Sequence, residues 1–252
     1  MPLCVMAAGA TDLGRRRQRN EDRFAIVPHH RLFIVADGMG GHRCGATASR
    51  VATETIVEFF RRSGSQGFEW PDRPDSRLSL PENRLLAAIR AANSSVYAQG
   101  LESRECRGMG STVVASVFDP LTEHMIVGHV GDSRAYRVRG REITRMTRDH
   151  SLTGEAMPSH QAVWFERFAK NALTRALGLS ASAIVDLRKE PVNVGDVFVL
   201  CSDGLTSLVP DHEILERILA ASDLQQACTT LIERANGAGG DDNITVVVMR
   251  VI

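Results

Sequence analysis

The strongest constraint on this chain is a set of acidic residues placed at the ends of apolar, strand-like runs. They are Glu21, Asp22, Asp37, Asp132, Asp203 and Asp242. Any one of them alone is explained by turn chemistry, because Asp beside Gly, Ser or Asn is common where a strand ends. Together they predict a fold whose strands deliver several carboxylates to one place, where an opposite charge must stabilise them.

The order of strand-like and helix-like segments predicts an α+β fold. Apolar strand-like runs occupy residues 24–27, 32–36, 111–118, 123–130, 134–139, 197–201 and 243–251. Helical periodicity occupies residues 45–62, 85–96, 211–220 and 224–235. Short turns with Pro, Gly or Asp join neighbouring strands, and these turns are too short for the crossovers of a parallel sheet. The sequence therefore predicts an antiparallel sheet core with helices packed outside it.

The length of the chain, 252 residues, is sufficient for one domain with a sizeable core. The sequence shows no internal repeat and no low-complexity tract. Residues 149–183 lack strand character and are predicted to leave the sheet as an excursion rather than to form a second domain. We therefore expect a single domain over residues 1–252.

Charge and hydropathy narrow the possible function classes. Lys plus Arg and Asp plus Glu number 30 each, so the formal net charge is zero. The broad basic field of a nucleic-acid-binding protein is therefore missing. No apolar run approaches the roughly 18 residues that a membrane span requires, and no secretory leader is recognisable. We expect a soluble, cytoplasmic protein without nucleic-acid or membrane partners.

The five cysteines are scattered along the chain and form no C-x-x-C pair. They are Cys4, Cys44, Cys106, Cys201 and Cys228. An odd number without paired spacing argues against a disulfide framework and against a thiolate zinc site. Reduced cytosol is the simplest environment for such a pattern, and Cys201, inside an apolar run, is expected in the core.

A divalent cation is the natural partner for the acidic residues. Oxygen ligands suit the hard ions Mg²⁺ and Mn²⁺, whereas Zn²⁺ prefers the His and Cys side chains that these loops mostly lack. Glycines at 38, 40 and 41 allow the backbone to turn sharply and approach an ion, so a main-chain carbonyl can join the Asp37 carboxylate as a ligand. A nearby arginine would add a planar fork for a phosphate group.

Eight ordered motifs carry a resemblance to a known family. They are "TDLGRRRQRNED", "VADGMGGH", "GMGSTV", "GHVGDSRAY", "RDHSLT", "NALTRALG", "CSDGLT" and "GGDDNITVVV". In this order they resemble the metal-dependent protein phosphatases of the PP2C (PPM) family, in its bacterial Ser/Thr branch, over residues 10–251. The resemblance implies a four-layer αββα fold, in which a central antiparallel β-sandwich is flanked by pairs of antiparallel helices.

The same resemblance implies a role for individual residues. The ligands of a metal pair are expected to be Asp22, Asp37, the Gly38 carbonyl, Asp203 and Asp242. Asp37 is expected to bridge both ions, with Glu21 in the same shell through water. Arg17 stands at the position that binds substrate phosphate in the family, whereas the neighbouring arginines are expected on a solvated face.

The sequence departs from relatives of this family in two places. Met39 stands where eukaryotic relatives often carry a histidine that acts as general acid, and His42 is either a supporting group near the metals or only a loop residue. Asp132 and Asp203 match the ligands of a third, weaker metal. Ser207 replaces an acidic residue that some relatives carry near that site.

Residues 149–183 correspond to the variable flap of the family, which lies beside the active site. Trp164, Phe165 and Phe168 in this stretch are either a local hydrophobic anchor or part of a surface that faces the substrate. The sequence alone leaves both readings open.

The resemblance implies a metal-dependent phosphatase for phosphoserine and phosphothreonine on proteins. A hydroxide that bridges two Mn²⁺ or Mg²⁺ ions would attack phosphorus directly. A bacterial Ser/Thr kinase and its substrates are the expected partners, and a monomer is expected. Two alternatives remain at this point: a phosphatase-like binding module without turnover, and a metal phosphoesterase acting on non-protein substrates.

Overall fold

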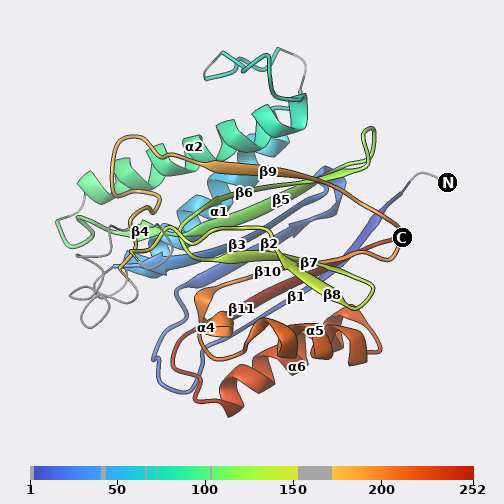
Figure 1. Cartoon of the computed structure of the whole chain (residues 1–252). Coiled ribbons are helices and arrows are strands. Elements are labelled where there is room, and N and C mark those ends of the chain that lie inside the picture. The colour runs from blue at the N-terminus through green and yellow to red at the C-terminus, as the bar shows by residue number, and fades with distance from the viewer. Residues whose placement is uncertain (1–2, 41–43, 66, 72, 103, 153–171) are drawn as a thin grey trace, which may run out of the picture.

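Two antiparallel sheets lie face to face at the centre of the computed structural model, which describes residues 3–40, 44–65, 67–71, 73–102, 104–152 and 172–252 (Figure 1). The first sheet contains, in spatial order, β1 (Val5–Asp12), β11 (Ile244–Val251), β10 (Val197–Cys201), β7 (Arg134–Arg139) and β8 (Glu142–Arg145). The second contains β2 (Asp22–Val27), β3 (Leu32–Met39), β5 (Val113–Asp119), β6 (His124–Val130) and β9 (Asp186–Pro191), with β4 (Gly110–Ser111) paired to β3.

Pairs of helices cover the outer faces of both sheets (Figure 1). α1 (Cys44–Arg62) and α2 (Leu80–Glu102) pack on the second sheet, while α5 (Asp211–Ala220) and α6 (Leu224–Gly237) pack on the first. The short α4 (Asp203–Thr206) follows β10, and the 3-10 turn η1 (Pro28–His30) joins β2 to β3. The predicted αββα architecture is confirmed.

Strand β3 shows why the apolar runs lack alternation. Leu32 and Ile34 belong to the apolar cluster beneath α1 and α2, whereas Phe33 and Val35 belong to the cluster between the two sheets. Side chains of a strand point alternately to opposite faces, so a strand covered on both faces needs apolar residues at every position. This arrangement makes the central strands a rigid support for whatever they carry at their ends.

The structure adds strands that the sequence did not predict. β1, β8 and β9 are absent from the expected pattern, and β9 is largely polar. β8 and β9 lie at sheet edges, and β1 pairs along its whole length with β11. Backbone hydrogen bonds to a neighbour define such strands, and their side chains need not be apolar.

The expectation that Asp37 follows the end of its strand is wrong. β3 continues to Met39, because Gly38 and Met39 pair with Ser111 and Gly110 of β4. Asp37 is therefore held by a strand on both sides rather than by a turn.

Among the described residues, no helix combines the length and apolar character needed to cross a membrane.

The expectation of five free cysteines is also wrong. Cys44, the first residue of α1, forms a disulfide with Cys106 in the segment before β4, although 62 positions separate them in the sequence. Folding brings their Cα atoms to 5.3 Å, a proximity that spacing along the chain could not reveal. Cys4, Cys201 and Cys228 are free, and the buried Cys201 confirms the core position expected for it.

Removing this disulfide is expected to lower the free energy of unfolding by about 2–4 kcal/mol, because the cross-link restricts the unfolded chain over a long loop. The Cys44→Ser/Cys106→Ser double variant should show this loss in denaturant unfolding, and reductant should produce the same loss in the wild type. The exposed Cys4 provides a matched control, since Cys4→Ser should change nothing. Alkylation of five thiols in the unreduced, unfolded protein would contradict the assignment.

Candidate active site

A cavity of about 450 Å³ opens at the end of the sheets that carries β4 and α4, away from the chain termini (Figure 1). It is lined by Arg17, Glu21, Asp37, Gly38, Met39, Gly40, Thr112, Asp132, Leu173, Asp203, Asp242 and Asn243. Tertiary structure thus gathers acidic residues from segments up to about 220 positions apart. Of the residues proposed from the sequence, only Asp22 lies behind the lining.

Asp22 and Asp37 lie opposite each other in neighbouring strands. Asp22 begins β2 and is the antiparallel partner of Asp37 in β3. Asp22 is only 4% exposed, and its Oδ2 accepts a hydrogen bond of 2.7 Å from the Ser202 hydroxyl. Its Oδ1 is buried without a hydrogen-bond partner among the described residues. A buried carboxylate oxygen without a partner is costly, and a cation would stabilise it.

Asp203 and Asp242 approach from the other sheet. Asp203 is the first residue of α4, directly after β10, and its Oδ1 is also buried without a partner in the described structure. Asp242 precedes β11, and the Asn243 backbone N–H donates to its Oδ1 over 2.8 Å. Two sheets therefore contribute carboxylates to the same cavity.

The electrostatics of these carboxyl groups agree with a cation site. Burial, followed by repulsion from neighbouring acids, raises the pKa of Asp22 to about 6 and holds the pKa of Asp37 well above its usual range. Burial and the Asp203 charge raise the pKa of Asp132 to about 7. Burial and the Asp242 charge also raise the pKa of Asp203. At Asp132 and Asp203 the nearby arginines do not offset burial and the neighbouring acids, so an added positive charge would stabilise the ionised forms.

Arg17 lies at the mouth of the cavity and forms an ion pair with Asp242, with Nη2 2.5 Å from Oδ2. Its side chain is half exposed, and the hydrogen bond to Asp242 raises its pKa. The neighbouring Arg16 points outward to Asp241 on the surface. The two arginine side chains therefore lie in different places, Arg17 at the cavity and Arg16 on the surface.

Asn243 fixes the loop that carries Arg17, a role that sequence reasoning missed. Its Oδ1 accepts from the Glu21 N–H over 2.8 Å, while its Nδ2 donates to the carbonyls of Leu13 and Arg19 at 2.9 Å each. One side chain thus ties both ends of the loop to the start of β11. The only signal for this role was its place in the motif "GGDDNITVVV".

Thr112 holds Asp37 in the same indirect way. Its N–H donates to the Asp37 carbonyl over 2.8 Å, and its hydroxyl accepts from the Asp37 N–H over 3.1 Å. The Ser111 hydroxyl adds a further bond of 3.0 Å to the Asp37 carbonyl. Both residues belong to the quoted motif "GMGSTV", but nothing in the sequence showed which partner they would bind.

Other expectations fall partly outside the described residues. His42, Trp164, Phe165 and Phe168 lie outside them, so their proposed roles stay predictions. Met39, which stands where some relatives carry a histidine, lines the cavity, and Leu173 reaches the cavity from the described end of the 149–183 stretch.

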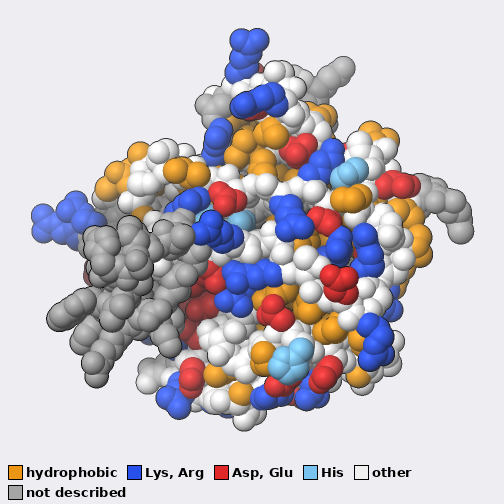
Figure 2. Space-filling model, viewed as in Figure 1, with side chains coloured by type: hydrophobic (Ala, Val, Ile, Leu, Met, Phe, Trp, Pro, Cys, Tyr) orange, Lys and Arg blue, Asp and Glu red, His pale blue; other side chains and the backbone are white. Residues whose placement is uncertain are grey.

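Blue Lys and Arg side chains alternate with red Asp and Glu side chains on the face shown in Figure 2. This mixture agrees with the zero formal net charge of the chain. The described part of this face shows no broad basic area.

Comparisons with known proteins agree with this geometry. The family described as protein phosphatase 2C matches residues 12–241. The chain belongs to the protein phosphatase 2C family. The serine/threonine phosphatase Stp of Listeria monocytogenes is 32% identical over 245 residues, covering 95% of this chain and 93% of the relative.

Solved structures of protein phosphatase 2C relatives show the same fold. The catalytic domain of PstP in complex with two manganese ions is 31% identical with a TM-score of 0.79, and the alignment covers 99% of both chains. The Streptococcus agalactiae serine/threonine phosphatase is 32% identical with a TM-score of 0.82, covering 98% of this chain and all of the other. The acidic cavity described above suits the Mn²⁺ or Mg²⁺ cofactors of a protein phosphatase 2C.

The stability of this protein phosphatase 2C without metal is expected to fall as pH rises from about 4 to about 7. The folded carboxyl groups hold protons above the pH at which the unfolded chain releases them, so folding is favoured at the acidic end of this window and loses that advantage through the raised pKa values. For Asp22 alone the loss should be on the order of 3 kcal/mol, since its pKa rises from 3.8 to about 6 and one pKa unit corresponds to about 1.4 kcal/mol.

Denaturant unfolding with EDTA at pH 5 and pH 7.5 measures this effect. Saturating Mn²⁺ should restore the stability lost at pH 7.5, because the ion favours the charged carboxylates. The Asp22→Asn variant should show a smaller difference between the two pH values. An equal pH difference in this variant and in the wild type would contradict the assignment.

Proposed function

We propose that this protein phosphatase hydrolyses phosphoserine and phosphothreonine on proteins with two Mn²⁺ or Mg²⁺ ions. The supporting observation is a pair of buried oxygens without a partner in the described structure, Asp203 Oδ1 in the lining of the cavity and Asp22 Oδ1 outside it, while Arg17 also lines the cavity. Cations would stabilise the carboxylates, and the guanidinium would bind a phosphate. The relative named above is a serine/threonine phosphatase, which favours the same substrate class here.

Specific residues would hold the cofactors. The metal pair would be held by Asp22, Asp37, the Gly38 carbonyl, Asp203 and Asp242, where Asp37 would be shared by both ions and Glu21 would lie nearby. Glu21 fits this place because its carboxylate lies close to Gly45, where an added Cβ would be 2.6 Å from Oε2. Gly38 is equally constrained, since its own Cβ would meet the Gly45 carbonyl oxygen at 1.9 Å. Only glycine allows the backbone to pass here.

Side chains of the cavity would orient the substrate phosphate for hydrolysis. The bound ions supply an activated water nucleophile and neutralise charge at phosphorus. Arg17 would hold the phosphoryl oxygens with its planar fork, while Thr112 keeps Asp37 in place. The carboxylates that line the cavity would be occupied with the cations, which leaves them poor nucleophiles. We propose direct hydrolysis in one displacement at phosphorus, without a phosphoenzyme.

We further propose a third, weaker ion at Asp132 and Asp203. Asp132 lines the cavity beside Asp203, whose charge contributes to the raised pKa of Asp132. A cation shared between the two carboxylates would relieve this repulsion. Ser207, which replaces an acidic residue of some relatives, donates its N–H to the Asp203 carbonyl.

The cellular assignments remain proposals. We propose that the enzyme opposes a bacterial Ser/Thr kinase on shared protein substrates, acts as a monomer and consists of one catalytic domain. A cytoplasmic location also stays a prediction, and the Cys44–Cys106 disulfide removes the argument from reduced cysteines.

Hydrolysis of a phosphothreonine peptide tests the proposed function. We expect turnover by the wild type with Mn²⁺ and none above background with EDTA or in the Asp203→Asn variant. A nucleotide and an oligonucleotide, assayed in parallel, should be poor substrates. Peptide turnover no faster than in these controls would refute the enzyme reading and favour a binding module, whereas preference for the nucleotide or oligonucleotide would favour a phosphoesterase for other substrates.

A further inference from the structure

We propose that His150 is a positioning residue that fixes the Gly131–Asp132 turn at the edge of the active site. Its imidazole is 1% exposed and lies outside the cavity, so it does not touch the substrate. It acts through the backbone of the turn that carries Asp132. This inference rests on the proposed role of Asp132 as a metal ligand.

His150 forms two hydrogen bonds with the turn. Its backbone N–H donates to the Gly131 carbonyl over 3.0 Å, and its Nδ1 accepts from the Gly131 N–H over 3.1 Å. The backbone of Gly131 is therefore satisfied in both directions by one residue that lies 19 positions further along the chain. Gly131 has a φ of 109°, so the turn adopts a conformation that other residues rarely accept.

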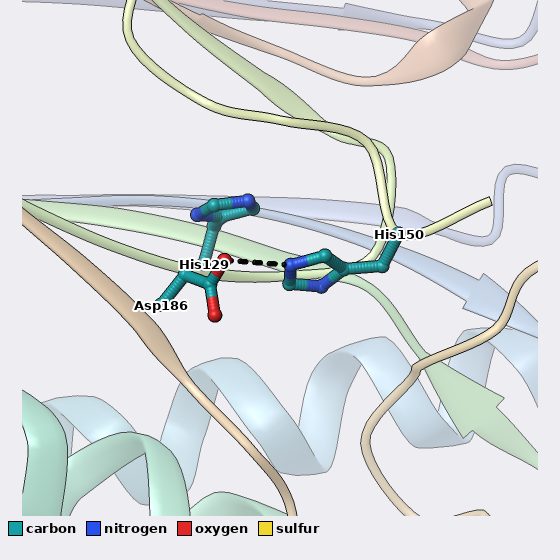
Figure 3. A group of neighbouring side chains, drawn as sticks. All are labelled: His129, His150 and Asp186. Atoms are coloured by element: carbon teal, nitrogen blue, oxygen red, sulfur yellow. Dashed lines mark hydrogen bonds and ion pairs between the residues drawn. The ribbon is translucent and has the colours of Figure 1, made fainter. Parts of the chain in front are cut away.

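The contacts of the ring select one tautomer. Because Nδ1 accepts a hydrogen bond, the proton of the neutral imidazole must be on Nε2. Nε2 lies 3.2 Å from Asp186 Oδ2 and can donate to it, as Figure 3 shows. Arg175 Nη1 lies 3.1 Å from the other Asp186 oxygen and orients this carboxylate. Asp186 therefore selects the tautomer that leaves Nδ1 able to accept.

A neighbouring histidine fixes the plane of the ring. His129 stacks on His150 with 4.6 Å between the ring centroids and an interplanar angle of 18°. The His129 Nε2 in turn donates to the Arg148 carbonyl over 2.8 Å. Stacking and the hydrogen bond to Asp186 together leave the imidazole little freedom to rotate away from Gly131.

The same cluster is less suited to a metal ion. The possible ligand atoms of His129, His150 and Asp186 all lie within 4.8 Å of one another (Figure 3). A metal on His150 Nε2 would force the proton onto Nδ1, where it would face the Gly131 N–H instead of accepting from it. The Arg175 guanidinium is also 3.4 Å from Nε2. Positioning therefore explains this cluster better than coordination does.

The Gly131–Asp132 turn also packs against Thr112, the residue that holds Asp37. A Cβ on Gly131 would approach Thr112 Cβ and Cγ2 to 2.7 Å, so the turn packs tightly on this side chain. The Thr112 hydroxyl bonds to Ser133 Oγ over 2.7 Å and to the Asp37 N–H. A continuous set of contacts therefore runs from Asp186 through His150 and the turn to Asp37.

Substitutions at His150 test the role through metal binding as well as activity. His150→Phe keeps the ring and its stacking but removes the acceptor, whereas His150→Asn can place an amide oxygen where Nδ1 was. We expect His150→Phe to weaken Mn²⁺ binding, measured by calorimetry, and to raise the Mn²⁺ concentration for half-maximal turnover by about 10-fold or more. His150→Asn should recover most of both losses. His212→Phe, an exposed histidine on α5, is the matched control.

Two further measurements keep the proposal falsifiable. The losses caused by His150→Phe and Asp132→Asn should be less than additive in the double variant, because part of the His150 effect passes through Asp132. Nitrogen-15 NMR of the metal-free wild type should show His150 with Nε2 protonated and Nδ1 unprotonated. Equal Mn²⁺ binding by His150→Phe and the wild type, no recovery by His150→Asn, or the opposite tautomer would overturn the proposal. The NMR and calorimetry do not require turnover, so failure of the proposed phosphatase function would be distinguishable.

Discussion

Asp37→Asn should abolish Mn²⁺-dependent hydrolysis of a phosphothreonine peptide, with a fall in kcat on the order of 10³-fold or more, equivalent to about 4 kcal/mol. Asp37 lies in β3 between the Asp22 partner strand and the Thr112 contacts, so its carboxylate is delivered to a fixed point in the cavity. An amide keeps the shape of this side chain but removes the charge that would bridge two cations.

The same substitution should leave the fold intact. The pKa of Asp37 is raised by burial and by the charges of Asp22 and Asp203, so an uncharged side chain removes repulsion. We expect the metal-free variant to be at least as stable at pH 7.5 as the metal-free wild type, measured by denaturant unfolding. Loss of activity with retained stability separates a direct role from misfolding.

Asp241→Asn is the matched control for this prediction. Asp241 is adjacent to Asp242 in sequence, but its side chain is half exposed and pairs with Arg16 on the surface. This variant should keep turnover within about twofold of the wild type, since exposed ion pairs contribute little. Wild-type turnover by Asp37→Asn would remove this residue from the site.

Arg17→Ala should lower kcat/KM for the same peptide by about 10- to 100-fold. A hydrogen bond to a charged partner contributes about 1.5–3 kcal/mol, which corresponds to about 10- to 100-fold, and the planar guanidinium has the geometry to make such a bond to a phosphate. Arg17 is half exposed at the cavity mouth, and in this structure it pairs with Asp242. The variant should also bind Mn²⁺ no more weakly than the wild type, because Asp242 loses a competing partner.

Arg17→Lys and Arg16→Ala sharpen this test. Lysine keeps the charge but not the fork, so Arg17→Lys should recover only part of the lost kcat/KM. Arg16, which is 72% exposed, should be replaceable by alanine within about twofold. Equal effects of Arg17→Ala and Arg16→Ala would show that the phosphate is bound elsewhere.

Much of the fold could be predicted from local patterns. The turns between apolar runs indicated antiparallel pairing, and the helical periods indicated the segments that cover both sheets. β8 and β9 escaped prediction because an edge strand is defined by backbone bonds to one neighbour. The end of β3 was misplaced for a related reason, since its last residues pair with β4, a strand of only two residues.

The residues that support the site were harder to predict than those that line it. Carboxylates at the ends of apolar strands stand out in a sequence because burying an acid is costly. Asn243, Thr112 and His150 belong to residue types that have many ordinary structural uses. Their roles depend on which backbone groups they meet. Asn243 meets Glu21, Leu13 and Arg19 more than 220 positions away, and His150 meets Gly131 across a turn between sheets.

The sequence by itself determined the acidic residues of the cavity, the arginine at its mouth and the antiparallel α+β class. The acidic residues and the fold class follow from residue chemistry and from turns within a few positions of each other, whereas the arginine was indicated by its place in a family motif. Tertiary structure alone decided the Cys44–Cys106 disulfide, the loop anchored by Asn243 and the turn clasped by His150. The physical reason is that these contacts join distant segments, whose proximity is set by the packing of two sheets and their helices rather than by local sequence.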